Sequence, residues 1–156
     1  MPIAYPAHLP PLQRASKSRS QPARFTIAEP RRGYGYAQAT GTDTPVFWDG
    51  QFKFSSENAV VYQLWLTQDL QGGLLEFSMP IRTEFGLLVH TCRFLDDGLN
   101  NASEDGGVWT YPVKIMARRQ LIPQAFIDAQ DLITQLPNWS AWAQLLDQAI
   151  AELPEA

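Results

Sequence analysis

The stretch Val46-Phe47-Trp48-Asp49-Gly50-Gln51-Phe52-Lys53-Phe54 decides the fold. It is rich in aromatic residues, and apolar and polar residues alternate near its end, which is typical of a half-buried β-strand. Ser55-Ser56-Glu57 follows, with hydroxyls that cap a helix N-terminus and an acidic residue for the first turn. We therefore predict a strand over 46–54 that leads into a helix over 59–70.

The chain downstream of this helix alternates between turn signals and apolar runs. Gln71-Gly72-Gly73 ends the helix, because glycine readily takes the left-handed conformation of a helix C-terminus. Turn residues also fill 96–107. Three further strands are predicted over 74–79, which stops at Pro80, over 86–95 and over 108–117.

The last predicted strand shows the period of two most clearly. Its odd-numbered residues share one face, and Pro112 on the other face indicates an edge position or a break. The order strand–helix–strand–strand–strand predicts an α+β fold, a small mainly antiparallel sheet packed by a helix, as a core domain over 46–120. The shared face comprises Trp109, Tyr111, Val113, Ile115 and Ala117.

Residues 121–156 are predicted to form a C-terminal helical segment. Pro123 suits the start of one helix, Pro137 ends it, and Asn138 can cap a second. The second helix needs a partner surface for its two tryptophans, either in its own core or on a neighbouring subunit. Its apolar residues at helical spacing are Trp139, Trp142, Leu145, Leu146, Ala149, Ile150 and Leu153.

Residues 1–45 are predicted to be an extended basic arm, because seven prolines interrupt any regular pattern. Six Lys and Arg stand against Glu29 and Asp43, a net charge of +4, whereas residues 123–156 hold five acids and no Lys or Arg, a net charge of −5. Opposite ends of this kind favour head-to-tail contact between copies, and the alternative is two solvated ends. The predicted partner contacts are Tyr5, Arg14, Arg19, Arg24, Arg31, Arg32, Tyr34, Tyr36, Trp139 and Trp142.

Composition sets the class of protein. With 156 residues, 45% of them apolar, the chain suits one globular domain. The sequence has no run of about 18 apolar residues, so we predict no membrane-spanning helix. It has no continuous apolar stretch of signal-peptide length near Met1, so we predict no secretion signal. A single cysteine, Cys92, excludes an intrachain disulfide and favours a reducing compartment.

No constellation of residues predicts catalysis or metal binding. His90 and Cys92 stand two apart on one strand face, but without a nucleophile motif a packed histidine is the better interpretation. Zinc-ligand spacings are absent, and the acidic loop 96–105 lacks the spacing of a calcium loop. Gly33-Tyr34-Gly35 precedes no predicted helix, so it is not a phosphate loop. We expect no enzyme, no cofactor and no metal.

The basic arm also suits nucleic acid, because arginines alternate with Phe25, Tyr34 and Tyr36, which offer phosphate contacts and stacking. The chain as a whole is acidic, with a net charge of −4. A dedicated nucleic-acid binder is usually basic, so contact with acidic protein surfaces is the favoured interpretation.

A pattern of mainly apolar, aromatic, proline and glycine residues runs from the N-terminus through the predicted core: Tyr5-Pro6, Leu9-Pro10, Leu12, Thr44-Pro45-Val46-Phe47-Trp48, Phe52-Lys53-Phe54, Trp65, Gly72-Gly73, Phe77, Pro80, Arg93-Phe94 and Trp109. In this pattern the chain resembles small virion proteins of tailed bacteriophages, from the tail or the head–tail junction. The resemblance covers residues 1–120 and implies a structural subunit of the tail or neck that forms a ring through arm and core contacts. Its partners would be copies of itself and other virion proteins, and its place would be the virion, or the host cytoplasm during assembly. Tail completion, neck and tail-tip roles stay open.

Overall fold

The computed structural model describes residues 1–41 and 44–151 and divides the chain into two compact units, Met1–Leu121 and Ile122–Ala156. The predicted boundary after residue 120 lies one residue before this division. Asp43, Glu152, Leu153 and Glu155, which entered the predictions above, lie outside the described residues. None of the described helices combines the length and the apolar character that crossing a bilayer requires.

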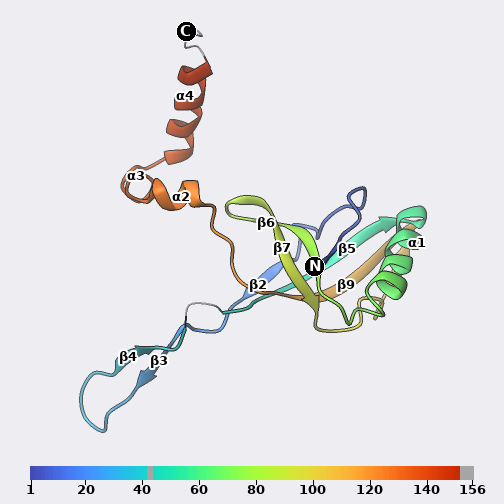
Figure 1. Ribbon diagram of the computed structural model, residues 1–156, viewed down its shortest axis with the longest axis horizontal. Helices are drawn as coiled ribbons and strands as arrows, with labels where there is room; N and C mark the ends of the chain where they lie inside the picture. Colours follow the sequence, from blue (N-terminus) through green and yellow to red (C-terminus); the bar gives the residue numbers. More distant parts are fainter. Residues whose placement is uncertain (42–43, 152–156) are drawn as a thin grey trace. The chain divides into compact units, whose positions relative to one another are not determined.

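The larger unit is built on a seven-stranded, mainly antiparallel sheet (Figure 1). The strand order is β1-β6-β7-β9-β5-β2, with β8 added on β9, and only the β1–β6 pair is parallel. With the helices described below, this sheet confirms the predicted α+β class. The strands are β1 (Ile3–Ala4), β2 (Ser18–Ser20), β5 (Val46–Ser55), β6 (Phe77–Thr83), β7 (Gly86–Phe94), β8 (Ser103–Asp105) and β9 (Val108–Ala117).

Strands β5 and β9 form the centre of the sheet. They pair over their whole lengths, from Val46 opposite Ala117 to Ser55 opposite Val108. Along β5 the even-numbered residues are buried and the odd-numbered ones are half-buried or exposed, as a strand with one face on the core requires. The predicted strands over 46–54 and 108–117 are confirmed.

A helix follows β5 directly. The Ser55 hydroxyl accepts a hydrogen bond from the Asn58 amide at 3.4 Å, so the predicted capping serine is confirmed and α1 (Ser56–Leu64) begins three residues earlier than expected. The last turn is π-helical, η1 (Trp65–Asp69), which turns Trp65 and Leu66 into the core. Left-handed backbone at 71–73 then ends the helix as predicted.

The core between this helix and the sheet is aromatic. Tyr62 packs between rings of β5 and β9, and its hydroxyl donates to the Gly98 carbonyl at 2.9 Å, which satisfies the buried phenol. The cluster is stabilised by apolar burial and by stacked or edge-on ring pairs. Its rings belong to Tyr5, Phe52, Phe54, Tyr62, Trp65, Phe77, Phe94 and Tyr111.

Both strand prolines are explained by the backbone ladder. The prediction that a strand stops at Pro80 is wrong, since β6 continues to Thr83. The Ser78 carbonyl accepts a hydrogen bond from the Tyr5 amide on the side of β6 that faces away from β7. Residues two apart in a strand direct their backbone groups to the same side, so the Pro80 nitrogen also faces away from β7, where no donor is needed. Pro112 lies opposite Gln51, and its other side falls between the segments that pair with β7 and with β8. Strand β9 is central in the sheet, so of the two predicted alternatives, an edge position or a break, the structure shows a local break in pairing on one side of β9.

The prediction of a detached arm over 1–45 is wrong for its first half. Strand β1 pairs with β6, and β2 pairs with β5. Between these strands the chain crosses the core, where Tyr5, Leu9 and Leu12 are each at most 6% exposed. Prolines prevent regular structure here but not packing, because irregular backbone can still insert apolar side chains.

Only the second half of the predicted arm stays outside the core. It folds into a two-stranded sheet, β3 (Phe25–Ala28) and β4 (Tyr36–Ala39), which we call the hairpin (residues 25–39). It follows β2 and precedes β5 in the chain, and Figure 1 shows it as a separate ribbon beyond these strands.

The smaller unit is helical, as predicted, with α2 (Gln124–Asp128), α3 (Gln130–Gln135) and α4 (Trp139–Ala151). The single helix expected before Pro137 is divided at Ala129, where the backbone leaves helical geometry. Asn138 takes a left-handed φ of 58°, an amide-bearing residue suited to that conformation, and α4 starts at the next residue.

Candidate functional site

The hairpin has one apolar and one more polar face. Its register places Phe25 opposite Ala39 and Ile27 opposite Ala37, and residues that face each other across a ladder share a side of the sheet. These four residues form the apolar face of the hairpin. Its two large side chains stay exposed, Phe25 by 49% and Ile27 by 60%. Two exposed apolar side chains on one face make the hairpin a candidate interaction surface.

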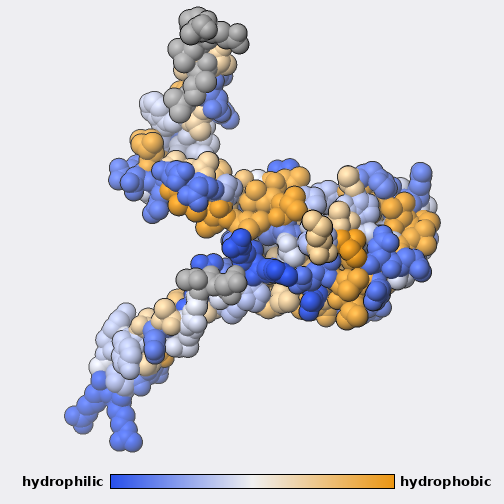
Figure 2. Space-filling view, viewed as in Figure 1, coloured by the Kyte–Doolittle hydropathy of each residue, from blue (hydrophilic) through white to orange (hydrophobic). Residues whose placement is uncertain are grey.

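The tip of the hairpin is basic. Arg31 and Arg32 are exposed there, beside Gly33 with its φ of +103° and Tyr34, whose side chain is fully exposed. Figure 2 shows the tip as the most hydrophilic part of the hairpin. With Arg24 and Glu29 the segment 24–39 has a net charge of +2. The hairpin therefore combines an apolar face with a positive end.

Polar contacts close the base of the hairpin. The Thr40 amide donates to the Arg24 carbonyl at 2.9 Å, and the Arg24 and Gln21 side chains both donate to the Thr44 hydroxyl. A two-stranded hairpin with an exposed apolar face is only marginally stable alone in water. The base fixes where the hairpin starts, and a partner on the apolar face would add the burial that it lacks.

The smaller unit carries an apolar groove of about 300 Å³ between its helices. Phe126 and Trp139 meet edge to face at 5.7 Å inside it, while Leu132 and Trp142 are 65% and 59% exposed. Figure 2 shows hydrophobic residues along α2 and α3. We call this feature the C-terminal groove; it is lined by Ala125, Phe126, Ala129, Leu132, Ile133, Leu136, Trp139, Trp142 and Ala143.

The charge of the smaller unit is negative. Its described part, residues 122–151, contains Asp128, Asp131 and Asp147 and no Lys or Arg, a net charge of −3. Asp128 and Asp131 stand on α2 and α3, the helices that line the C-terminal groove. The lining of the groove is uncharged, and the unit that carries it has the opposite net charge to the hairpin.

The structure separates the predicted partner contacts into distinct groups. Tyr5 is a correction: it is buried in the core of its own chain, so it does not reach a partner. Arg14 is exposed in the segment that leads to β2. Arg24, Arg31, Arg32, Tyr34 and Tyr36 gather on the hairpin or at its base, and Trp139 and Trp142 line the C-terminal groove.

Arg19 serves its own fold. Its guanidinium donates two hydrogen bonds of 2.8 Å to the Glu84 carboxylate and lies over the Trp48 ring at 5.5 Å. The bidentate contact holds the pKa of Glu84 below its usual value. Arg19 therefore fastens β2 to the β6–β7 turn.

Ile27 is absent from the predicted partner contacts, and Phe25 was named only as a residue that could stack on nucleic-acid bases. The predicted partner contacts in this segment are arginines and tyrosines, because the surrounding prolines indicate an extended arm. The alternation Phe25-Thr26-Ile27, matched by Ala37-Gln38-Ala39, is a period of two that indicates a one-sided hairpin. The signal is short, and only the register in the structure shows that both apolar pairs share one face.

His90 and Cys92 do lie on one buried face of β7, but they do not form a nucleophile–base pair. His90 Nδ1 contacts the Leu88 carbonyl at 2.9 Å, its Nε2 is enclosed without a partner, and the Cys92 thiol points to the His90 carbonyl. Burial lowers the pKa of His90 and raises that of Cys92 to about 12, so both groups stay neutral near pH 7.

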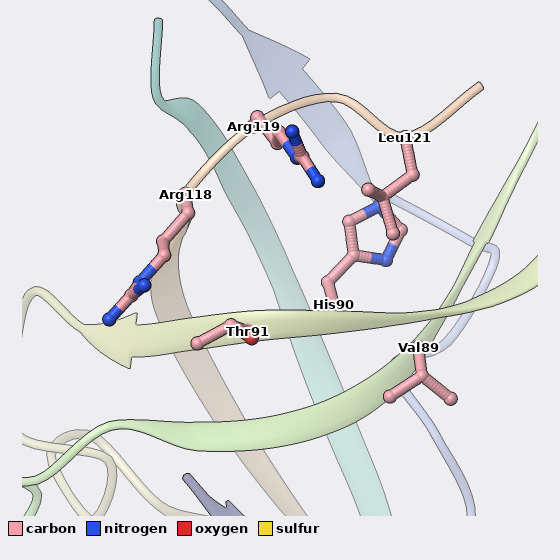
Figure 3. Close-up of a pocket in the computed structure, with 6 residues that line it drawn as sticks. All are labelled: Val89, His90, Thr91, Arg118, Arg119 and Leu121. Atoms are coloured by element: carbon pink, nitrogen blue, oxygen red, sulfur yellow. The ribbon is translucent and has the colours of Figure 1, made fainter. Parts of the chain in front are cut away.

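A polar pocket lies beside this histidine. Figure 3 shows the His90 ring facing Leu121 and Arg119, while Arg118 extends away from the ring. Arg118 forms an ion pair with Glu76 at 2.6 Å, which lowers the pKa of that exposed carboxyl. Because Nε2 is closed off by protein atoms, this pocket does not present the imidazole to a ligand.

The acidic loop binds its own backbone. The Asp96 carboxylate accepts from the Asp97 amide at 2.8 Å, and the Asp97 carboxylate accepts from the Leu99 amide at 3.1 Å. Strand β8 occupies the end of this loop and pairs with β9. Among the described residues, no three acidic, histidine or cysteine side chains converge to hold a metal ion.

Comparison with known proteins assigns no family to this chain. No family model, no curated protein and no solved structure matches it.

Proposed function

We propose that this chain is a non-enzymatic structural subunit of a tailed-bacteriophage virion, in the tail or neck, where copies assemble into a ring. The observation that carries the proposal is the hairpin, whose apolar face is exposed in the isolated chain. A subunit of an assembly requires such a surface, whereas an isolated globular domain gains nothing from it.

Two further features support an assembling subunit. The C-terminal groove is a second exposed apolar surface, on a separate unit. In this proposal the resemblance to small phage virion proteins, which spans residues 1–120, has nearly the same bounds as the larger unit, Met1–Leu121. In this proposal the partners are other copies and neighbouring virion proteins, and the chain resides in the virion, or in the host cytoplasm during assembly.

A deletion of residues 1–40 would remove β1, β2 and three core side chains together with the hairpin, so it would not test the hairpin alone. Only the hairpin should be removed. Arg24 and Thr40 are joined by a backbone hydrogen bond of 2.9 Å, so an Asn-Gly turn can replace residues 25–39 and connect them.

The full-length chain is expected to form a closed ring at micromolar concentration, and the shortened chain to remain a folded monomer. Mass photometry measures the copy number, and circular dichroism verifies that the shortened chain is folded. A full-length chain that stays monomeric, and that does not enter particles when added to an assembly extract, would refute the proposal.

A second candidate function is nucleic-acid binding, favoured by the exposed Arg31, Arg32 and Tyr34 at the tip of the hairpin. Positive side chains on a two-stranded arm can contact phosphates, and a tyrosine can stack on a base. This function predicts binding to duplex or single-stranded DNA that weakens steeply between 50 and 200 mM salt. Absence of binding at low salt in a filter or gel-shift assay would eliminate it.

A further inference from the structure

We propose that the apolar face of the hairpin in one copy docks into the C-terminal groove of the next copy. The inference rests on the proposed ring and names the two surfaces that form its repeated contact. One surface belongs to the larger unit and the other to the smaller unit, so every copy offers one of each.

The first argument is chemical match. The hairpin presents Phe25 and Ile27 from one side of a narrow ribbon, and the groove presents Leu132 and Trp142 beside the Phe126–Trp139 pair. Both surfaces are apolar and exposed in the single chain, so their contact removes apolar area from water on both sides. Aromatic side chains on both partners add edge-on or offset ring contacts, which makes them the expected centre of the interface.

The second argument is charge. The hairpin segment 24–39 has a net charge of +2, and residues 122–151 have a net charge of −3. Two hairpins, or two grooves, would place like charges together, whereas a hairpin against a groove places opposite charges together. Electrostatic complementarity of this kind selects the partner and the orientation. The occupant of the groove is therefore a hairpin and not a second groove.

The third argument is symmetry. A contact between two different surfaces of the same chain is heterologous, so each copy keeps one free hairpin and one free groove after the first contact forms. Repeating the contact closes the assembly into a ring when the rotation per copy divides a full turn, and it produces an open filament otherwise. A second copy is the occupant that satisfies every hairpin and every groove in such a ring.

The experiment uses the full chain and two variants with substitutions at exposed positions only. The hairpin variant carries Phe25→Ser and Ile27→Ser, and the groove variant carries Leu132→Ser and Trp142→Ser. The matched control carries Thr26→Ser and Gln38→Ser, a cross-strand pair on the opposite face of the same hairpin. Circular dichroism and thermal denaturation verify that all chains are folded.

Each variant alone is expected to stay monomeric, with self-association weakened about tenfold or more, while the control assembles like the full-length wild type. The decisive sample is the mixture of the two variants. The hairpin variant keeps its groove and the groove variant keeps its hairpin, so the mixture restores one junction and forms a pair of one copy each, with no larger species. Mass photometry distinguishes this pair from monomers and rings.

Three results would overturn the inference. If both variants form wild-type rings, the ring function stands and these surfaces are not its contact. If both are monomeric but their mixture forms no pair, the two surfaces are each needed for assembly but do not bind each other. If the wild-type chain itself never assembles, the ring and this contact fail together, an outcome that the wild-type sample alone reveals.

Discussion

Replacing Tyr5 by alanine is expected to lower the free energy of unfolding of the larger unit by about 3 kcal/mol. This residue lies near the start of the chain, where an extended arm would tolerate any change. In the structure its ring is 6% exposed, stacked on Phe52 at 5.8 Å and edge-on to Trp65 at 5.3 Å. Its hydroxyl donates to the Pro10 carbonyl at 2.7 Å.

The magnitude follows from these contacts. Truncating a buried aromatic side chain to alanine costs about 3–5 kcal/mol. We take the lower end, because the segment is held by the two-residue strand β1 and can partly close over the space. Tyr5→Phe keeps the ring and removes only the hydroxyl, so it should cost about 1 kcal/mol through the unpaired Pro10 carbonyl.

Urea denaturation followed by tryptophan fluorescence measures this change. Trp139 and Trp142 are first replaced by phenylalanine, so that the signal comes from the larger unit, which contains the other three tryptophans. Tyr34→Ala is the matched control, since that side chain is fully exposed and should change stability by less than about 0.5 kcal/mol. A Tyr5→Ala chain as stable as the Tyr34→Ala chain would refute the packing of the N-terminal segment.

Three other perturbations test the core. Gly98→Ala should cost about 1–3 kcal/mol, because a Cβ there would lie 2.7 Å from the Tyr62 hydroxyl; Gly41→Ala, with open space around it, is the control in the same urea assay. Burial lowers the pKa of His90 below 6.5, so the unfolded chain binds a proton at this histidine more readily than the folded chain does. The contribution of His90 to the free energy of unfolding is therefore fully present above about pH 6.5 and decreases as the pH falls below it. His90→Asn should remove this dependence between pH 6.5 and 5 in urea titrations at several pH values, and an unchanged profile would show that the histidine is not its source. The buried Cys92 thiol, with its pKa raised to about 12, should react with a disulfide reagent at pH 8 only as fast as the core opens, and an immediate reaction without urea would contradict its burial.

The central layer of this protein is predictable from local sequence patterns. The alternation in β5 and β9 and the serine before α1 are local signals, since each depends only on neighbours along the chain. Strand period, helix capping and glycine turns are consequences of backbone geometry, which is why they were predicted from residues alone. The separate helical segment after residue 120 was predicted in the same way.

The role of the first 45 residues depends instead on tertiary contacts. Prolines made the whole segment look extended, but Tyr5, Leu9 and Leu12 reach the core through irregular backbone that has no period to detect. Phe25 and Ile27, equally apolar, stay exposed because their strand pairs only with β4. Whether an apolar side chain is buried or left for a partner depends on contacts distant in sequence, and local patterns carry no record of those contacts.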